Sequence, residues 1–323
     1  MGTDTQATGD EAGVNWRSVV WITGAALALY AGFRVLPTGT NLHHMDFQVS
    51  GANALEMCDP TRPQFIPVVA ARSPVRLELR AEGGAVPVVG EAGRFVLTLT
   101  TSAGKAIAPV DLLTVHTRKL HLLVIDPTLR DYQHLHPEPG ELPGEWVFAH
   151  TPRRAGVYRV FADFTPAATG RGLYSFADYT VDGEAAAAGR AGEDVAMTRL
   201  GEEAAEGAWR FRLATRDGAA VRAGVATTLV FSGRELAGGA VPLTLVMDAY
   251  AHLVAFDPQR SGFAHLHPRG ERPGDYAVKA PDAREPKLFF DLMIPTPGRY
   301  VVWAQVNLQG GERFLPFEIE VGF

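Results

Sequence analysis

Beyond about position 70, apolar residues come in short runs, often alternating with polar ones and broken by glycine and proline. This pattern is typical of β-strands joined by turns, and helical periodicity is scarce after residue 40. Seven short strands within about 120 residues are typical of a β-sandwich. The predicted strands are Val75–Leu79, Arg94–Thr100, Leu120–Ile125, Tyr132–His136, Trp146–His150, Gly156–Phe164 and Tyr174–Val181.

The same unit occurs a second time along the chain. His121–Pro137 and His252–Pro268 lie 131 positions apart without a gap and share His-Leu, Asp-Pro and His-Leu-His-Pro. Gly156–Ala162 and Gly298–Ala304 share Gly-x-Tyr and lie 142 positions apart, so we place an insertion of 11 residues at 270–286. A tyrosine that opens a strand in this way is typical of immunoglobulin-like and cupredoxin-like sandwiches, where its hydroxyl holds a preceding turn. We therefore expect an all-β protein with two tandem β-sandwiches of this kind.

An apolar segment precedes the sandwiches. Residues 18–33 carry no charge, and the stretch to residue 36 is long enough for a transmembrane helix, although a soluble buried helix is an alternative. Acidic residues before Arg17 and the lack of a small-x-small site argue against a cleaved signal peptide. The predicted organisation is a tail at 1–17, a membrane anchor at 18–36, a connector at 37–62, a first sandwich at 63–183, a linker at 184–207 and a second sandwich at 208–323.

Composition narrows the classes of partner and compartment. With 323 residues, 46% hydrophobic and 20% charged, the chain has the composition of a globular protein of about two domains. The net charge of −6 comes without a basic stripe, so nucleic acid is not an expected partner. The single cysteine, Cys58, excludes an internal disulfide and a site built from paired cysteines. We expect the bulk of the chain outside the cytoplasm, in a periplasm or at the cell surface, held to the membrane by the N-terminal helix.

Six of the ten histidines occupy repeated positions, three in each copy. In His-Leu-His the two histidines point to one face of a strand, because side chains alternate. The preceding strand returns through a turn, and one register sets His121 opposite His136, so that three imidazoles converge. A slip of one residue would point His121 to the opposite face, and the sequence leaves both registers open. The candidate metal ligands are His121, His134, His136, His252, His265 and His267.

A further pair of positions points to the kind of metal. His116 in the first copy corresponds to Met247 in the second. Imidazole and thioether both bind copper, whereas hard cations need oxygen-rich sites. Copper or a similar late transition metal is therefore the predicted ion, with His116 and Met247 as added ligands. The loop residues His43, His44 and Met45 are a candidate for loose metal capture, or a solvated linker, and His150, which has no counterpart, is expected to be structural.

The His-apolar run followed by His-x-His-Pro resembles bacterial extracytoplasmic domains of the YtkA-like kind, over about fifty residues in each copy. This resemblance implies a cupredoxin-like or immunoglobulin-like fold, membrane anchoring and a link to copper or other heavy metals. Blue-copper cupredoxins use a cysteine ligand after the Gly-x-Tyr strand, and this sequence has no cysteine after Cys58. The resemblance therefore implies the fold without a blue-copper centre.

Signatures of catalysis are missing from the sequence: there is no phosphate-binding glycine loop, no Gly-x-Ser-x-Gly and no His-Glu-x-x-His. Asp126 and Asp257 precede prolines, where aspartate usually accepts main-chain hydrogen bonds in a turn. We expect no enzyme and no organic cofactor. The predicted function is metal binding for sequestration, delivery or sensing, with a protein that donates or receives the metal as partner. The alternative is a structural or protein-interaction module in which the histidines only stabilise a sandwich corner.

Overall fold

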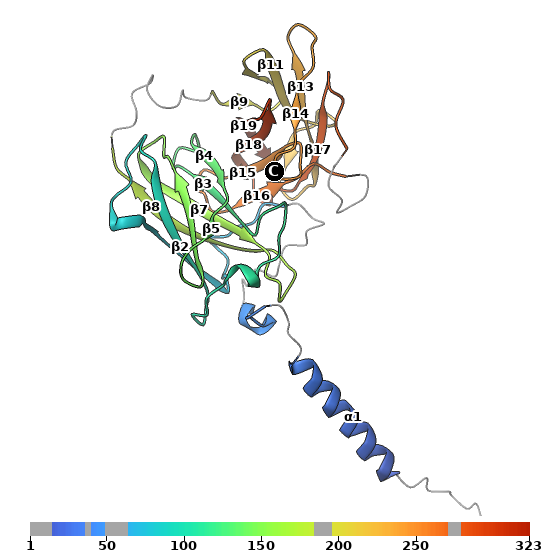
Figure 1. Ribbon diagram of the computed structural model, residues 1–323. Coiled ribbons are helices and arrows are strands. Elements are labelled where there is room, and N and C mark those ends of the chain that lie inside the picture. Colours follow the sequence, from blue (N-terminus) through green and yellow to red (C-terminus); the bar gives the residue numbers. More distant parts are fainter. Residues whose placement is uncertain (1–14, 36–39, 49–63, 184–195, 271–278) are drawn as a thin grey trace, which may run out of the picture. The chain divides into compact units, whose positions relative to one another are not determined.

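The computed structural model describes residues 15–35, 40–48, 64–183, 196–270 and 279–323 (Figure 1). Helix α1 (Trp16–Val35) lies in a first compact unit that ends at Gly39, and Thr40–Phe323 form a second unit. A helix at the predicted N-terminal segment is therefore confirmed. Within the described ranges, no helix combines the length and the apolarity that crossing a membrane requires.

The first sandwich has two antiparallel four-stranded sheets, with the strand orders β1-β2-β6-β5 and β4-β3-β7-β8. All seven strands predicted from the sequence are confirmed, and β5 is added at an edge. The strands are β1 (Val75–Ala81), β2 (Gly93–Thr101), β3 (Leu120–Ile125), β4 (Tyr132–Leu135), β5 (Glu138–Pro139), β6 (Glu145–His150), β7 (Gly156–Phe164) and β8 (Leu173–Val181). The short 3-10 helices are η1 (His44–Phe47), η2 (Glu82–Gly84) and η3 (Pro109–Asp111).

The second sandwich repeats this arrangement. Its sheets have the orders β10-β11-β13-β17 and β12-β19-β18-β15-β16, and β14 and β9 pair with β18 and β19. Its first strands are β9 (Thr198–Arg199), β10 (Glu203–Glu206), β11 (Trp209–Thr215), β12 (Val221–Arg222), β13 (Thr227–Glu235) and β14 (Leu243–Thr244). The remaining strands are β15 (His252–Phe256), β16 (Phe263–Leu266), β17 (Lys287–Leu292), β18 (Gly298–Leu308) and β19 (Gly311–Gly322).

The strand order confirms the duplication read from the sequence. The order β11-β13-β17 corresponds to β1-β2-β6, and β16-β15-β18-β19 corresponds to β4-β3-β7-β8. The stretch from β16 to β17 is 11 residues longer than the stretch from β4 to β6, as the two displacements predict. Residues 271–278 of this stretch lie outside the described residues.

The second sandwich begins earlier than the predicted boundary at 208. Strands β9 and β10 fall within the predicted linker 184–207, and β10 forms a hairpin with β11 through a turn at Gly207, where φ is 56°. The sequence of β10, Glu-Ala-Ala-Glu, lacks β-branched residues, so residue preference gives no sign of a strand. Pairing with the neighbouring strands decides its conformation instead.

Residues assigned to the start of the first sandwich also pair with the second one. Gln64 and Ile66 form bridges to Met293 and Phe263. The approach is so close that a Cβ atom at Gly262 would lie 1.8 Å from the carbonyl oxygen of Ile66. Glycine at 262 is therefore required by this contact. The two sandwiches share chain segments and belong to one compact unit.

Strand β3 is buried on both faces, which explains why its sequence is apolar from Leu122 to Ile125. Leu122 and Val124 point into the core of the first sandwich. Leu123 and Ile125 point the other way and belong to a cluster shared with the second sandwich. His121 lies on this second face, because alternate residues of a strand share a face.

This shared cluster forms the interface between the two sandwiches. Its buried members are Ile66, Val68, Leu123, Ile125, Leu129, Tyr132, Phe161, Val254, Phe256, Phe263, Val301 and Trp303. Hydrogen bonds cross the interface as well: Trp303 Nε1 donates to the carbonyl of Leu129 at 3.2 Å, and Arg159 Nη1 donates to the carbonyl of Arg260 at 2.7 Å. The interface therefore holds the sheet that contains β3 against the sheet that contains β15.

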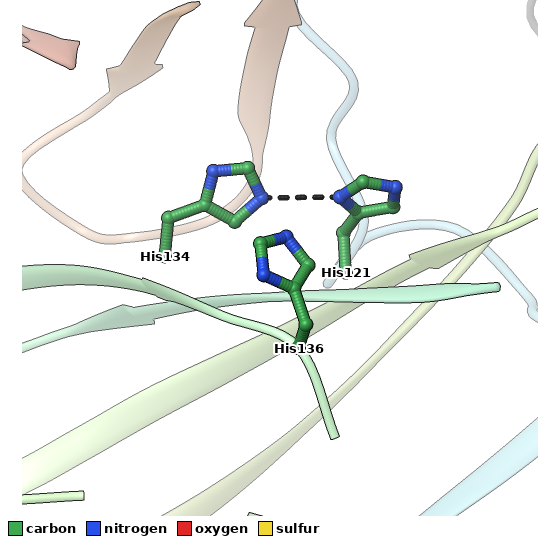
Figure 2. A group of neighbouring side chains, drawn as sticks. All are labelled: His121, His134 and His136. Carbon is green, nitrogen blue, oxygen red and sulfur yellow. Dashed lines mark hydrogen bonds between the residues drawn. The ribbon is translucent and has the colours of Figure 1, made fainter. Parts of the chain in front are cut away.

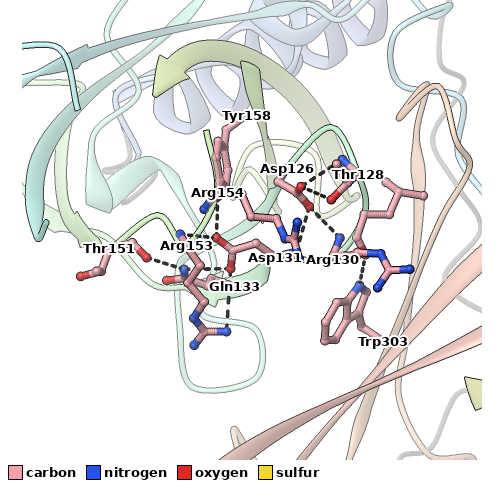
Figure 3. A network of polar contacts seen from close by, with 11 residues as sticks. Asp126, Thr128, Arg130, Asp131, Gln133, Thr151, Arg153, Arg154, Tyr158 and Trp303 are labelled. Carbon is pink, nitrogen blue, oxygen red and sulfur yellow. Dashed lines mark hydrogen bonds and ion pairs between the residues drawn. The ribbon is translucent and has the colours of Figure 1, made fainter. Parts of the chain in front are cut away.

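Both predicted tyrosine corners are confirmed. In the first copy, the Tyr158 hydroxyl donates to Asp131 Oδ2 at 2.5 Å and accepts from the Arg154 amide at 3.0 Å (Figure 3). In the second copy, the Tyr300 hydroxyl lies 2.7 Å from Thr296 Oγ1. Each hydroxyl thus holds the turn four residues earlier, as sandwich corners of this kind require.

Residues 40–48 of the predicted connector pack against the first sandwich. Leu42 and Phe47 join its core, and the amide of Asn41 donates to Asp111 Oδ1 at 2.6 Å. The connector sequence therefore contributes to the fold at this end.

Candidate metal centre

The pairing of β3 with β4 gathers the histidines of the first copy. Leu122 lies opposite Leu135 and Leu123 lies opposite His134. The same register places His121 opposite His136, immediately after the last paired residue of β4. Of the two registers that the sequence left open, the structure has the one in which the three imidazoles converge.

Figure 2 shows these three rings turned toward one another. The ring centroids of His121 and His134 are 5.4 Å apart, those of His121 and His136 5.0 Å, and those of His134 and His136 4.8 Å. His121 and His134 are buried, and His136 is half-buried. We call these three residues the first cluster.

The second copy repeats the arrangement on β15 and β16, where Leu253 lies opposite Leu266. The ring centroids of His252 and His265 are 5.6 Å apart, and each is 4.7 Å from that of His267. We call these three residues the second cluster. In each cluster, one nitrogen from every histidine lies within 4.8 Å of the others.

The two clusters adjoin each other across the interface, which the sequence did not predict. The ring centroids of His134 and His265 are 5.1 Å apart. Those of His121 and His265, and those of His134 and His252, are both 5.8 Å apart. The tandem sandwiches therefore bring all six repeated histidines into one region, because β3 and β15 both turn their histidine face toward the interface.

Hydrogen bonds to the main chain fix one nitrogen of two histidines. His121 Nε2 lies 3.0 Å from the carbonyl oxygen of Val115, and His252 Nε2 lies 2.9 Å from that of Val246. A carbonyl oxygen only accepts, so each Nε2 carries the proton. In the neutral rings, Nδ1 of both histidines therefore keeps its lone pair for a ligand.

The middle histidine of each cluster is held by a polar residue of the other sandwich. His134 Nδ1 lies 2.9 Å from Gln305 Oε1, and His265 Nδ1 lies 3.0 Å from Asp163 Oδ2. Gln305 is oriented by its own amide nitrogen, which donates to Glu312 Oε2 at 2.9 Å. Both Nδ1 atoms are consequently donors, which leaves Nε2 of each ring as the nitrogen with a lone pair.

The sequence interpretation missed Asp163 and Gln305. Both lie five residues after the tyrosine of a Gly-x-Tyr strand, in segments that are otherwise apolar, Val-Phe-Ala-Asp-Phe and Val-Trp-Ala-Gln-Val. A polar residue at the same place in two buried strands was the available signal. The histidine that each residue bonds could not be named, because it lies in the other copy.

The closest contact within the first cluster joins two atoms that both carry lone pairs in neutral rings. His121 Nδ1 and His134 Nε2 are 3.2 Å apart, drawn as the dashed line in Figure 2. The other nitrogen of each ring already donates its proton, to Val115 and to Gln305. Two lone pairs at this distance repel unless a proton or a metal ion lies between them. An ion about 2.0–2.1 Å from both nitrogens would make an angle of about 100°, which is close to tetrahedral.

The remaining nitrogens face the same regions. Among the described residues, buried nitrogens without a hydrogen-bond partner include His136 Nε2, His252 Nδ1 and His265 Nε2. Nitrogens that share one tetrahedral ion are about 3.3–3.4 Å apart. Within each group the nitrogens lie within 4.8 Å of one another, so any pair wider than the tetrahedral spacing would have to approach to share one ion.

The environment of His116 and of five cluster histidines favours their neutral form. Burial is the largest cause, and the nearby histidines add to it. Together they lower the pKa of His136 from its usual value near 6.5 to about 3, and that of His116 to about 4. The same causes lower the pKa values of His121, His134, His252 and His267. Neutral imidazole is the form that binds metals.

His116 joins the second cluster and not that of its own copy. It lies in the turn Val115–Arg118, and its ring stacks on that of His267 with centroids 3.7 Å apart. Met247 occupies the equivalent turn, Val246–Ala249. The φ angles are 47° for His116 and 49° for Met247, so both residues adopt the same left-handed conformation, which is uncommon outside glycine.

The other residues singled out from the sequence lie elsewhere. His43 and His44 are exposed, with His43 capping η1. The Tyr179 hydroxyl lies 2.5 Å from His150 Nδ1, outside both clusters and in keeping with the structural role predicted for His150. Cys58 lies outside the described residues.

Asp126 and Asp257 are confirmed as turn residues. Asp126 accepts hydrogen bonds from the amides of Thr128, Arg130 and Asp131 (Figure 3). Asp257 Oδ1 accepts from the amide of Ser261 at 2.7 Å. These turns set the return of β4 and β16 and thereby the register of the histidines.

Comparison with known proteins defines the family of the chain. A family described as a domain of unknown function, DUF8832, matches residues 74–184 on the first sandwich and 205–322 on the second. The chain belongs to this family. Among curated proteins, none matches the sequence.

Solved structures that align with the chain share little sequence with it. Alpha-2-macroglobulin of Escherichia coli is 12% identical over 77% of this chain and 22% of that one, with a TM-score of 0.24. Invasin, a bacterial integrin-binding protein, is 14% identical over 75% and 39%, with a TM-score of 0.22. A putative membrane anchored protein from Corynebacterium diphtheriae is 10% identical over 76% and 58%, with a TM-score of 0.21. The chain spans less than half of the length of the first two.

Proposed function

We propose that this protein binds metal ions through its two histidine clusters, one ion in each. The observation that carries the proposal is the 3.2 Å approach of His121 Nδ1 to His134 Nε2, while the other nitrogen of each ring donates a hydrogen bond elsewhere. A buried arrangement of this kind is repulsive when empty and neutral, and a cation relieves the repulsion. The polar residues behind His134 and His265 orient the rings in the way that outer partners orient metal-ligating histidines.

Copper or a similar late transition metal is the ion that this donor set fits. The clusters offer imidazole nitrogen, with a thioether close in sequence, and no carboxylate is among the six ligands. Calcium and magnesium need oxygen ligands and are unsuited to it. The lowered pKa values mean that little proton release is needed at neutral pH before an ion binds.

Sequestration, delivery or sensing of the metal are the roles that such centres serve, with a donor or acceptor protein as partner. The resemblance to YtkA-like domains, the membrane anchor at 18–36 and the location outside the cytoplasm stay predictions from the sequence. So does the expectation that the protein is not an enzyme. Metal binding itself depends on none of them.

Metal analysis of the full chain tests the proposal. The purified chain, stripped with a chelator and dialysed against Cu(II) or Zn²⁺, should retain about two ions, one per cluster. His134→Asn should retain about one, because asparagine keeps a donor near the place of Nδ1 but removes Nε2. The double variant His43→Asn, His44→Asn is the matched control and should retain two, since both side chains are exposed. A wild-type chain that holds no ion, or a His134→Asn chain that still holds two, would overturn the proposal.

A second candidate is an interaction module whose histidines serve the fold alone. It is favoured by the bonds of His121 Nε2 and His252 Nε2 to main-chain carbonyls, which hold the turns before β3 and β15. In that case His134→Asn should change stability and leave no difference in metal content. Thermal unfolding of the stripped protein with and without Zn²⁺ separates the two, because an ion that binds the folded state at 100 times its Kd adds about 2.7 kcal/mol.

A further inference from the structure

The two clusters are related by an approximate two-fold axis that exchanges the sandwiches. His121 corresponds to His252, and His134 corresponds to His265. The exchange therefore carries the His121–His265 contact onto the His252–His134 contact, and the ring centroids are 5.8 Å apart in both. The hydrogen bonds of His134 and His265 cross between the sandwiches in the same manner. Residues of the two clusters that this axis relates to each other can thus be compared one by one.

One difference between the clusters lies at the rim. His116 stacks on His267, and so adds a fourth imidazole to the second cluster. The axis carries this contact onto Met247 and His136, because Met247 occupies the equivalent turn with the same backbone conformation. From this symmetry and the equivalent turn, the thioether of Met247 is inferred to take the place at the first cluster that the imidazole of His116 has at the second.

Another difference lies behind the middle histidine. His265 donates to the carboxylate of Asp163, whereas His134 donates to the neutral amide of Gln305. Asp163 and Gln305 occupy equivalent places in β7 and β18, opposite His121 and His252. A carboxylate partner raises the electron density of the ligating imidazole more than an amide does.

We infer that the metal centres formed by the first and the second cluster, called the first and the second centre, prefer different ions. This inference rests on the proposed function. The first centre, with Met247 at its rim and an amide behind His134, favours Cu(I), because soft thioether ligands select this ion. The second centre, with His116 at its rim and a carboxylate behind His265, favours a divalent ion such as Zn²⁺ or Cu(II). An all-imidazole set with a negative charge behind it stabilises the higher charge.

Two variants of the full chain isolate the centres. His134→Asn leaves the second centre, and His265→Asn leaves the first, since each asparagine keeps the donor to Gln305 or Asp163. Affinity for Cu(I) is measured without oxygen by competition with a chromophoric cuprous chelator, and affinity for Zn²⁺ by competition with a zinc dye. The ratio of the Zn²⁺ Kd to the Cu(I) Kd should be at least tenfold higher for the first centre. Ratios within threefold of each other would overturn the inference.

Exchanging the differing residues tests their role. In the His265→Asn chain, Met247→His should lower the ratio about tenfold, and in the His134→Asn chain, Asp163→Asn should weaken Zn²⁺ binding about tenfold. Matched controls are Leu236→His, at an exposed leucine, and Asp178→Asn, at a carboxylate that pairs with Arg159. Neither control should change a ratio by more than twofold. If Met247→His leaves the ratio unchanged, the thioether of Met247 is not a ligand of the first centre.

These experiments distinguish a failure of the proposed function from a failure of the inferred ion preferences. If neither single-centre chain binds Cu(I) or Zn²⁺, the proposed function itself fails. If both chains bind both ions in the same ratio, the metal centres stand and only their division of preference is wrong.

Discussion

Two buried polar regions of the first sandwich differ in how fully their hydrogen bonds are satisfied. Around the turn before β4, Asp126 accepts from three main-chain amides and Asp131 accepts from the Tyr158 hydroxyl, the Arg153 amide and Gln133 (Figure 3). In the first cluster, by contrast, His121 and His134 turn lone pairs toward each other. Both regions are buried, yet only in the turn are the acceptors matched by hydrogen-bond donors of the protein.

This difference separates polar groups that build the fold from groups that await a ligand. A buried network with every donor matched stabilises one conformation. A buried cluster with unmatched acceptors lowers stability and is retained for another reason. Removing a residue of the turn network should therefore lower the stability of the protein. The contribution of the clusters to stability should instead depend on pH and on metal ions.

Acid should produce the largest change in the metal-free protein. The pKa values of His136 and His150 are lowered to about 3 and that of His116 to about 4, mainly by burial. Below about pH 6.5 the unfolded chain binds protons that the folded chain does not, so the free energy of unfolding falls as the pH falls toward about 4. Each such histidine contributes about 1.4 kcal/mol per pH unit. Urea unfolding at pH 7.5, 6.5 and 5.5 after chelator treatment measures the slope.

The clusters can be tested as the source of this slope. His134→Asn should reduce it by about the share of one histidine, because burial lowers the pKa of His134 well below its usual value. His44→Asn, at an exposed position, should leave it unchanged. A free energy of unfolding that stays constant from pH 7.5 to 5.5 would contradict the comparison.

Deleting the carboxylate of the turn should have the next largest effect. Asp131→Ala leaves the Tyr158 hydroxyl and the Arg153 amide without their acceptor in a buried site, which should cost about 2–4 kcal/mol. Urea unfolding with an unchanged m-value measures the loss. Asp217→Ala, at an exposed turn, is the control and should stay within about 0.5 kcal/mol. Loss of a bound ion in Asp131→Ala would argue against separate roles for the two regions.

Much of this architecture could be predicted from the sequence, because local rules decide it. Alternation and turn residues predicted the strands of the first copy, and Gly-x-Tyr predicted both tyrosine corners. The convergence of three histidines in each copy followed from strand alternation and a short turn, once one register was assumed.

The rest depended on contacts between distant parts of the chain. The packing of the two sandwiches face to face was not predicted, although the apolar run from Leu122 to Ile125 in β3 was its signal. Asp163 and Gln305 could not be matched to His265 and His134, because each pair joins different copies. Strand β10 was missed because its pairing with β11, and not its residue preference, forms it.

The smallest expected effect is a difference in stability between variants of the two tyrosine corners, which occupy equivalent positions in the two copies. Tyr158→Phe removes a donor to the buried Asp131 and an acceptor for the Arg154 amide, where water has little access, and should cost about 1.5–2 kcal/mol. Tyr300→Phe removes a hydroxyl bonded to Thr296, which is exposed and can bond to water instead, so about 0.5–1 kcal/mol is expected. Urea unfolding of both variants under one condition measures the difference. Equal losses, or a larger one at Tyr300, would show that the turn network of the first copy adds nothing beyond an ordinary corner.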